Sequence, residues 1–151
     1  MTRALPGALL SGLLMIQSCG SLIPPPDKPS IDITGTWQGS TVTSCGVMLL
    51  EKGRCAATER ITFTLFQNGA DVNGIYRCAI GTMICRNMNN SGKVVSSSVT
   101  GSLARLRVML PDGSSCMFDG HFRSLSAAGS FFCYQGGGLV EQGRWNLARL
   151  Y

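Results

Sequence analysis

Cysteine is the residue type in this chain with the widest choice of chemistry, because a thiol can be oxidised, modified or bound to a metal. Seven cysteines are present, and they fall into two groups. Cys19 stands alone behind a basic start at Arg3 and an apolar run over residues 4–16. The other six are spread over the rest of the chain: Cys45, Cys55, Cys78, Cys85, Cys116 and Cys133. An even number of this kind predicts a disulfide framework if the chain is exported.

Zinc binding is the alternative use of these thiols, and the spacing argues against it. The sequence has no Cys-x-x-Cys pair, and His121 is its only histidine. Structural zinc sites usually combine closely spaced cysteine and histidine ligands. We therefore predict three disulfides, and neither a metal nor another cofactor.

The region before Cys19 has the features of a targeting segment. Its apolar run is shorter than the ~20 residues that a transmembrane helix needs, and it is typical of a signal peptide. Ile16-Gln17-Ser18-Cys19 resembles the lipobox of bacterial lipoproteins, with Gln17 where that family favours a small or hydroxylated residue. The resemblance implies removal of residues 1–18 and lipidation of Cys19. Gly20 after the cysteine is similar to lipoproteins sorted to the outer membrane. The alternative is an ordinary signal peptide with an unrelated cysteine.

A proline-rich segment separates this region from the rest of the chain. Residues 20–30 contain Pro24, Pro25, Pro26 and Pro29, which favour an extended chain and exclude a helix. The predicted organisation is a signal peptide over residues 1–18, a lipidated tether over residues 19–32 and one domain over residues 33–151. The predicted location is the bacterial cell envelope, with the lipid anchor in the outer membrane.

The composition of the chain suits a sheet protein that does not bind nucleic acid. Charged residues make up 14% of the sequence, below the usual quarter, and 19 residues are glycine. The net charge is +5, but the basic residues are scattered and form no dense run. Mild attraction to anionic head groups or glycans remains open.

Alternating apolar residues and turn signals predict eight strands, and no segment has a helical period. The predicted strands cover residues 33–43, 59–67, 70–78, 93–102, 104–110, 114–122, 126–134 and 139–149. A glycine, any residue and then a bulky one recur along them, as in Gly120-His121-Phe122, and glycines so placed let a sheet curl and close. We predict an all-β, eight-stranded antiparallel up-and-down barrel. The opening Gly35-Thr36-Trp37 motif and the strand count resemble lipocalin and avidin architectures, and the resemblance implies no ligand residues.

Strand alignment tests one of the fifteen possible cysteine pairings. If Cys116 faces Cys133, then Phe118 faces Phe131 and Gly120 faces Gly129. The hairpin then closes on the two-residue loop of residues 124–125, unless a four-residue loop serves the same register. Two further pairings, Cys45–Cys55 and Cys78–Cys85, would clamp two loops at the same end of the barrel. The tether would join the barrel at the opposite end.

The inside of the barrel and its bridged end are the two candidate binding regions. A set of large residues is predicted to point inward: Trp37, Phe63, Tyr76, Leu103, Phe122, Phe131 and Trp145. Their size favours a filled barrel over a ligand cavity. The clamped loops carry apolar residues and one arginine: Val47, Met48, Leu49, Leu50, Ile80, Met83, Ile84 and Arg86. These side chains either fold inward as a cap on the core, which is the favoured alternative, or form a preorganised contact surface.

Residues suited to catalysis are few. His121 points outward by strand parity, and Gly136-Gly137-Gly138 lacks the Lys-Ser/Thr of a phosphate loop. Glu141 shares a face with Gly143 and Trp145, so it either enters the barrel from inside or lies exposed on the rim, the rim being the favoured position. We predict no catalytic residue and no enzyme.

These observations predict a membrane-anchored binding lipoprotein that contacts a protein or an envelope component through its bridged end. Inhibition of a hydrolase is one version, by analogy with small lipoprotein barrels of similar size and anchoring. The alternative is a lipocalin-like carrier of a small apolar ligand near Trp37 and Trp145.

Overall fold

Eight strands and no helix make up the part of the chain that the computed structural model describes, which is residues 28–44, 58–78 and 91–151. The strands are β1 (Gly35–Thr43), β2 (Thr58–Asn68), β3 (Asp71–Cys78), β4 (Ser91–Thr100), β5 (Leu103–Met109), β6 (Ser115–Phe122), β7 (Ser126–Gln135) and β8 (Gly138–Leu150). All eight predicted strands are confirmed. Their ends lie within two residues of the predicted positions, because the period-2 alternation and the turn glycines mark them clearly.

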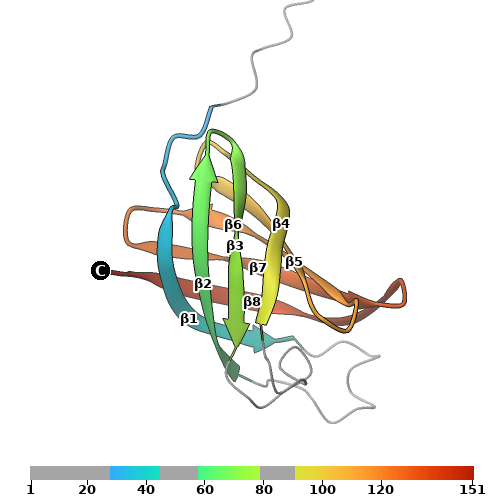
Figure 1. Ribbon diagram of the computed structural model, residues 1–151. Helices are drawn as coiled ribbons and strands as arrows, with labels where there is room; N and C mark the ends of the chain where they lie inside the picture. The colour runs from blue at the N-terminus through green and yellow to red at the C-terminus, as the bar shows by residue number, and fades with distance from the viewer. Residues whose placement is uncertain (1–27, 45–57, 79–90) are drawn as a thin grey trace, which may run out of the picture.

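The strands form one closed antiparallel barrel in chain order (Figure 1). Each strand pairs with its sequence neighbours, and β1 also pairs with β8, from Thr36 opposite Leu150 to Thr43 opposite Gly143. Closure leaves no free sheet edge. The predicted barrel topology is therefore confirmed.

The β6–β7 hairpin has the predicted register. Cys116 pairs with Cys133, Phe118 with Phe131 and Gly120 with Gly129. The Arg123 N–H donates to the Ser126 carbonyl at 2.7 Å, which closes a two-residue loop.

The Cys116–Cys133 disulfide is the bridge that the described residues contain. Cys78 is disulfide-bonded as well. The other cysteines of the predicted pairs, Cys45, Cys55 and Cys85, lie outside the described residues, as does Cys19. The disulfide prediction is thus confirmed for one bridge of the three.

Aromatic side chains fill the middle of the barrel. Six of the predicted interior residues are at most 3% exposed: Trp37, Phe63, Tyr76, Phe122, Phe131 and Trp145. Phe118 joins them, with its ring centroid 5.2 Å from that of Phe63 and 5.5 Å from that of Phe131. Rings at these distances interlock across the barrel. This packing favours a filled core at these levels.

Leu103 is the exception, and its predicted inward position is wrong. Its side chain is 44% exposed, whereas its strand neighbours Ala104, Leu106 and Val108 are buried. Strand parity counted from Gly101 fails because Gly101 belongs to the β4–β5 turn, with a φ of +57°. The strand begins only at Leu103, so its inward face is one residue further along.

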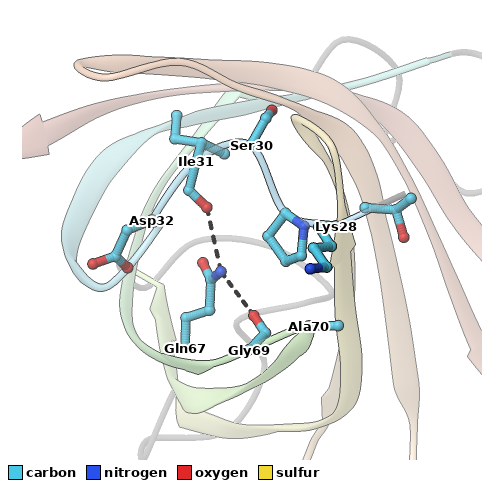
Figure 2. A pocket seen from close by; sticks show the side chains of 9 residues that line it. Lys28, Ser30, Ile31, Asp32, Gln67, Gly69 and Ala70 are labelled. Carbon is cyan, nitrogen blue, oxygen red and sulfur yellow. Dashed lines mark hydrogen bonds between the residues drawn. The ribbon is translucent and has the colours of Figure 1, made fainter. Parts of the chain in front are cut away.

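The segment before β1 closes one end of the barrel. Ile33 is fully buried, and its carbonyl accepts a hydrogen bond from Trp37 Nε1 at 2.8 Å. The Gln67 side chain holds the same segment, because its Oε1 accepts from the Ile33 N–H. Its Nε2 donates to the carbonyls of Ile31 and Gly69 (Figure 2). The segment is therefore fixed against the β2–β3 turn.

The segment before β1 and the Cys116–Cys133 bridge lie at opposite ends of the barrel. Residues 28–34 lie at the end with the β2–β3 and β4–β5 turns, where Pro29 pairs with Gly101 (Figure 1). At the opposite end β1 stops at Thr43, β2 starts at Thr58, and the Cys116–Cys133 bridge joins β6 to β7. We call this second end the mouth. The tether segment and the bridge thus occupy opposite ends.

Candidate functional site

Oxygen-bearing side chains gather inside the barrel, just below the mouth. We call them the mouth cluster: Thr41 and Thr43 of β1, Glu59 of β2, Tyr76 of β3 and Glu141 of β8. Each is at most 4% exposed. Because the strands run in the order β8, β1, β2, β3 around the barrel, the five residues come from four adjacent strands.

Strand alternation places these side chains inside. Glu59 lies on the same face of β2 as Ile61, Phe63 and Leu65, and it is paired with Thr41 across β1 and β2. Sequence reasoning missed Glu59 and the two threonines, although parity with that apolar run was a usable signal. From the sequence, a charged residue at the end of a strand is expected to be exposed. In the closed barrel, this face of β2 points inward instead.

Glu141 also lies inside, so its favoured exposed position on the rim is wrong. It is 4% exposed and opposes Cys133 on β7. Thr43 donates a hydrogen bond from its Oγ1 to Glu141 Oε1 at 2.6 Å. The reason is that the irregularity in the β7–β8 pairing lies before Glu141, opposite Tyr134, so Glu141 keeps the inward parity of Gly143 and Trp145.

Two groups of the mouth cluster, Glu59 and Tyr76, have raised pKa values. Burial, and after it the nearby charge of Glu141, raises the pKa of Glu59 to about 7. Burial, followed by the charges of Glu59 and Glu141, also raises the pKa of Tyr76 well above its usual range. Near neutral pH, Glu59 therefore keeps a proton that an exposed glutamate would have lost.

Two hydroxyl groups of the cluster lack a hydrogen-bond partner among the described residues. They are Thr41 Oγ1 and the Tyr76 hydroxyl, both fully buried, and neither has a partner among the residues that the structure describes. More than nine in ten buried polar groups are normally paired with protein or with ordered water. The cluster therefore has hydrogen-bonding capacity to offer to a bound group.

We expect Glu59→Gln to change how stability depends on pH. The wild-type pKa rises from 4.5 to about 7 on folding, so between these values the folded state keeps a proton that the unfolded chain releases. The contribution of Glu59 to the free energy of unfolding is therefore greatest below pH 4.5, falls as the pH rises to about 7 and is constant above that pH. Near pH 8 the variant should be more stable than wild type by about 1–2 kcal/mol, since one pKa unit is about 1.4 kcal/mol and solvent near the mouth screens part of it.

Urea unfolding at pH 4, 6 and 8 measures this difference. Asp71→Asn, an exposed carboxyl at the start of β3, is the matched control and should leave the profile unchanged. A constant stability difference between Glu59→Gln and wild type from pH 4 to pH 8 would contradict a raised pKa for Glu59.

The other predicted residues lie away from this cluster. His121 is exposed on the outer wall, with Nδ1 3.1 Å from Ser102 Oγ. The same wall carries an ion pair between Arg105 and Asp119, with Nε and Oδ1 3.0 Å apart. In the described ranges, no group of three or more His, Cys, Asp and Glu side chains is placed to hold a metal.

Two surface pockets also lie apart from the mouth cluster. One, of about 810 Å³, lies beside residues 28–32 at the tether end, where Gln67 Nε2 donates to the carbonyls of Ile31 and Gly69 (Figure 2). The other, also about 810 Å³, lies on the outer wall between Leu103, His121 and Arg144. Neither contains a buried polar group without a partner, so the mouth cluster is the stronger candidate.

The residues predicted to form binding loops lie outside the described residues: Val47, Met48, Leu49, Leu50, Ile80, Met83, Ile84 and Arg86. Their predicted role stays a prediction. The loops that carry them connect the strand ends that surround the mouth cluster.

No family model, curated protein or solved structure matches the chain in comparisons with known proteins. A separate search of the described ranges for helices long and apolar enough to span a membrane found none.

Proposed function

We propose that this protein is a non-enzymatic binding lipoprotein of the bacterial envelope, anchored in the outer membrane through Cys19. It contacts a protein or another envelope component at the mouth. The observation that supports this most is the separation of the two ends: residues 28–34 pack against the β2–β3 turn, and the Cys116–Cys133 bridge lies at the other end. A lipid attached before residue 28 would hold the first end near the membrane and direct the mouth away from it.

The packed interior supports contact at the mouth over transport of an apolar molecule. Trp37, Phe63 and Phe118 are fully buried at the middle of the barrel, and rings fill the space that a carrier keeps for its ligand. Near the mouth the inner wall becomes polar, with Glu59 and Glu141. An apolar ligand near the mouth would lie against polar side chains, which is unfavourable. A carrier of apolar ligands is therefore the weaker proposal.

A paired substitution tests the contact surface. We expect Met48→Ser with Leu49→Ser to lower capture of the partner from solubilised envelopes by about tenfold, the loss that ~1.4 kcal/mol produces. The protein should stay folded, as judged by its near-ultraviolet circular dichroism and its melting temperature. Quantitative mass spectrometry of proteins cross-linked to wild type and to the variant gives the readout.

Leu125→Ser is the matched control, because Leu125 is 52% exposed in the β6–β7 loop at the tether end. It should leave capture unchanged. Equal capture by the double variant and wild type would contradict the proposed surface. Loss of folding in the double variant would instead show that these side chains cap the core.

A further inference from the structure

Basic residues that are scattered along the sequence gather on the outer wall of the barrel, just below the mouth. Four of them lie within the three residues of their strands that are nearest the mouth: Arg60 on β2, Arg77 on β3, Lys93 on β4 and Arg107 on β5. All four are exposed, and their strands lie side by side in the barrel (Figure 1). We call these four residues the basic row. Arg144 of β8 lies beyond β1, where it opposes Val42, and extends the positive surface on that side.

The strand register makes each member of the basic row a diagonal neighbour of the next. Arg77 opposes a β2 residue two positions from Arg60. Lys93 opposes a β3 residue two positions from Arg77, and Arg107 opposes a β4 residue two positions from Lys93. Diagonal neighbours lie about 7–8 Å apart, so the four cations follow one line of roughly 20–25 Å around the barrel.

Acidic side chains of the described residues do not neutralise the basic row. The ion pair that these residues contain joins Arg105 to Asp119, further from the mouth. Glu59 is buried inside the barrel, and Asp71 lies at the other end of β3. Asp112, in the β5–β6 turn, accepts hydrogen bonds within its own turn. In the described part of the chain, the row therefore keeps its positive charge on the surface.

Cations at this spacing act together on an anion. The Debye length at physiological salt is about 8–10 Å, so adjacent members of the row lie within one Debye length of each other and their fields add. Their mutual repulsion is unfavourable for folding. An anionic partner removes this cost and releases the counterions that surround the row. The row therefore favours a ligand with several negative charges along its length over a single small anion.

The shape of the row and its neighbours favour a flexible sugar polymer. The row spans four of the eight strands of a closed barrel, so it follows a curved wall of which a flat bilayer surface would reach only a part. Hydroxyl side chains that can hydrogen-bond to sugars lie beside the cations: Ser40 opposes Arg60, and Thr62 and Ser91 both oppose Arg77. Among the described pairings, no aromatic residue opposes a member of the row, whereas single-stranded nucleic acids usually stack on aromatic rings.

We infer that the basic row binds an anionic polysaccharide, a chain of sugars that carries carboxylate or phosphate groups. Arg60, Arg77, Lys93 and Arg107 pair with the anionic groups, and the neighbouring hydroxyl side chains contact the sugars. Resting on the proposed function, the polysaccharide is the envelope component that the protein contacts at its mouth end.

Titration of the purified full-length protein in detergent with octagalacturonate, a sugar chain with one carboxylate on each sugar, tests the row without any other partner. We expect binding in 50 mM NaCl that weakens about tenfold or more in 250 mM NaCl, because counterions are released on binding. Arg77→Gln with Lys93→Gln should weaken binding about tenfold through the loss of two charge contacts. Lys28→Gln with Arg123→Gln is the matched control, because it removes the same charge from exposed positions at the tether end. The control should bind as wild type does.

Maltooctaose, a neutral sugar chain of the same length, should not bind. Equal weakening in the two double variants would show that only the net charge of the protein matters, and it would overturn the inference. Equal affinity for maltooctaose would overturn it too, as would tighter binding of phosphatidylglycerol vesicles, of octaglutamate or of a single-stranded oligonucleotide. Failure of the octagalacturonate titration leaves the Met48/Leu49 capture result standing, and unchanged capture in that variant leaves the titration result standing, so the two proposals fail separately.

Discussion

Replacing Gly129 by alanine should cost at least about 3 kcal/mol of folding free energy, a large part of the roughly 5–15 kcal/mol typical of a domain. Gly129 opposes Gly120 across β6 and β7. A Cβ at Gly129 would lie 1.9 Å from the Asp119 carbonyl oxygen and 2.6 Å from the Gly120 Cα. Both atoms belong to the backbone, so no side chain can move aside to relieve the clash. Relief requires the two strands to separate, which breaks the ladder that closes the barrel.

Guanidinium unfolding monitored by tryptophan fluorescence measures this loss, because Trp145 opposes Gly129 on β8. Gly138→Ala is the matched control: a Cβ there meets only the Gln135 carbonyl oxygen, at 3.7 Å, so we expect a change within about 0.5 kcal/mol. A Gly129→Ala protein as stable as the control would show that β6 and β7 are not held this closely.

Removing the Cys116–Cys133 bridge should cost about 2–4 kcal/mol. The two cysteines are 17 positions apart in sequence, so the bridge restricts the unfolded chain over the whole β6–β7 hairpin. Alanine at both positions avoids placing new polar groups at sites that are only 1% and 3% exposed. Chemical reduction would be a less specific test, since Cys78 is disulfide-bonded too.

The free energy of unfolding of the Cys116→Ala, Cys133→Ala protein gives the size of the effect. Ser115→Ala with Tyr134→Phe is the matched control, because this neighbouring pair joins the same two strands and keeps the bridge intact. The control should fall within about 0.5 kcal/mol of wild type. A loss below about 1 kcal/mol in the bridge variant would mean that the hairpin pairing alone already restricts the unfolded chain, contrary to our expectation.

Strand positions and hairpin register were predictable from the sequence because they depend on local patterns. Alternating residues such as Ile61, Phe63 and Leu65 mark a half-buried strand wherever it lies. The β6–β7 register follows from matching cysteine, glycine and phenylalanine across one turn. Parity counting failed at Leu103, where the turn glycine lies outside the strand from which the face should be counted.

The mouth cluster depends on distant parts of the chain. Glu59 and Glu141 are far apart in sequence, and they meet only because β1 pairs with both β2 and β8 when the barrel closes. The burial that raises the pKa of Glu59 is likewise a property of the closed interior. Strand parity indicates the face on which such a carboxylate lies, but only the closed barrel decides whether that end of the face is buried.

The sequence by itself determined the all-β class, the eight strands, the pairing of Cys116 with Cys133 and the inward face of most strands, since each follows from neighbours in the chain or across one turn. Only the tertiary structure decided that Leu103 points outward and that the carboxyl groups of Glu59 and Glu141 are buried together below the mouth. The physical reason is that all the surrounding strands determine the environment of a side chain inside a barrel. A sequence pattern contains information about the side chain's own strand only.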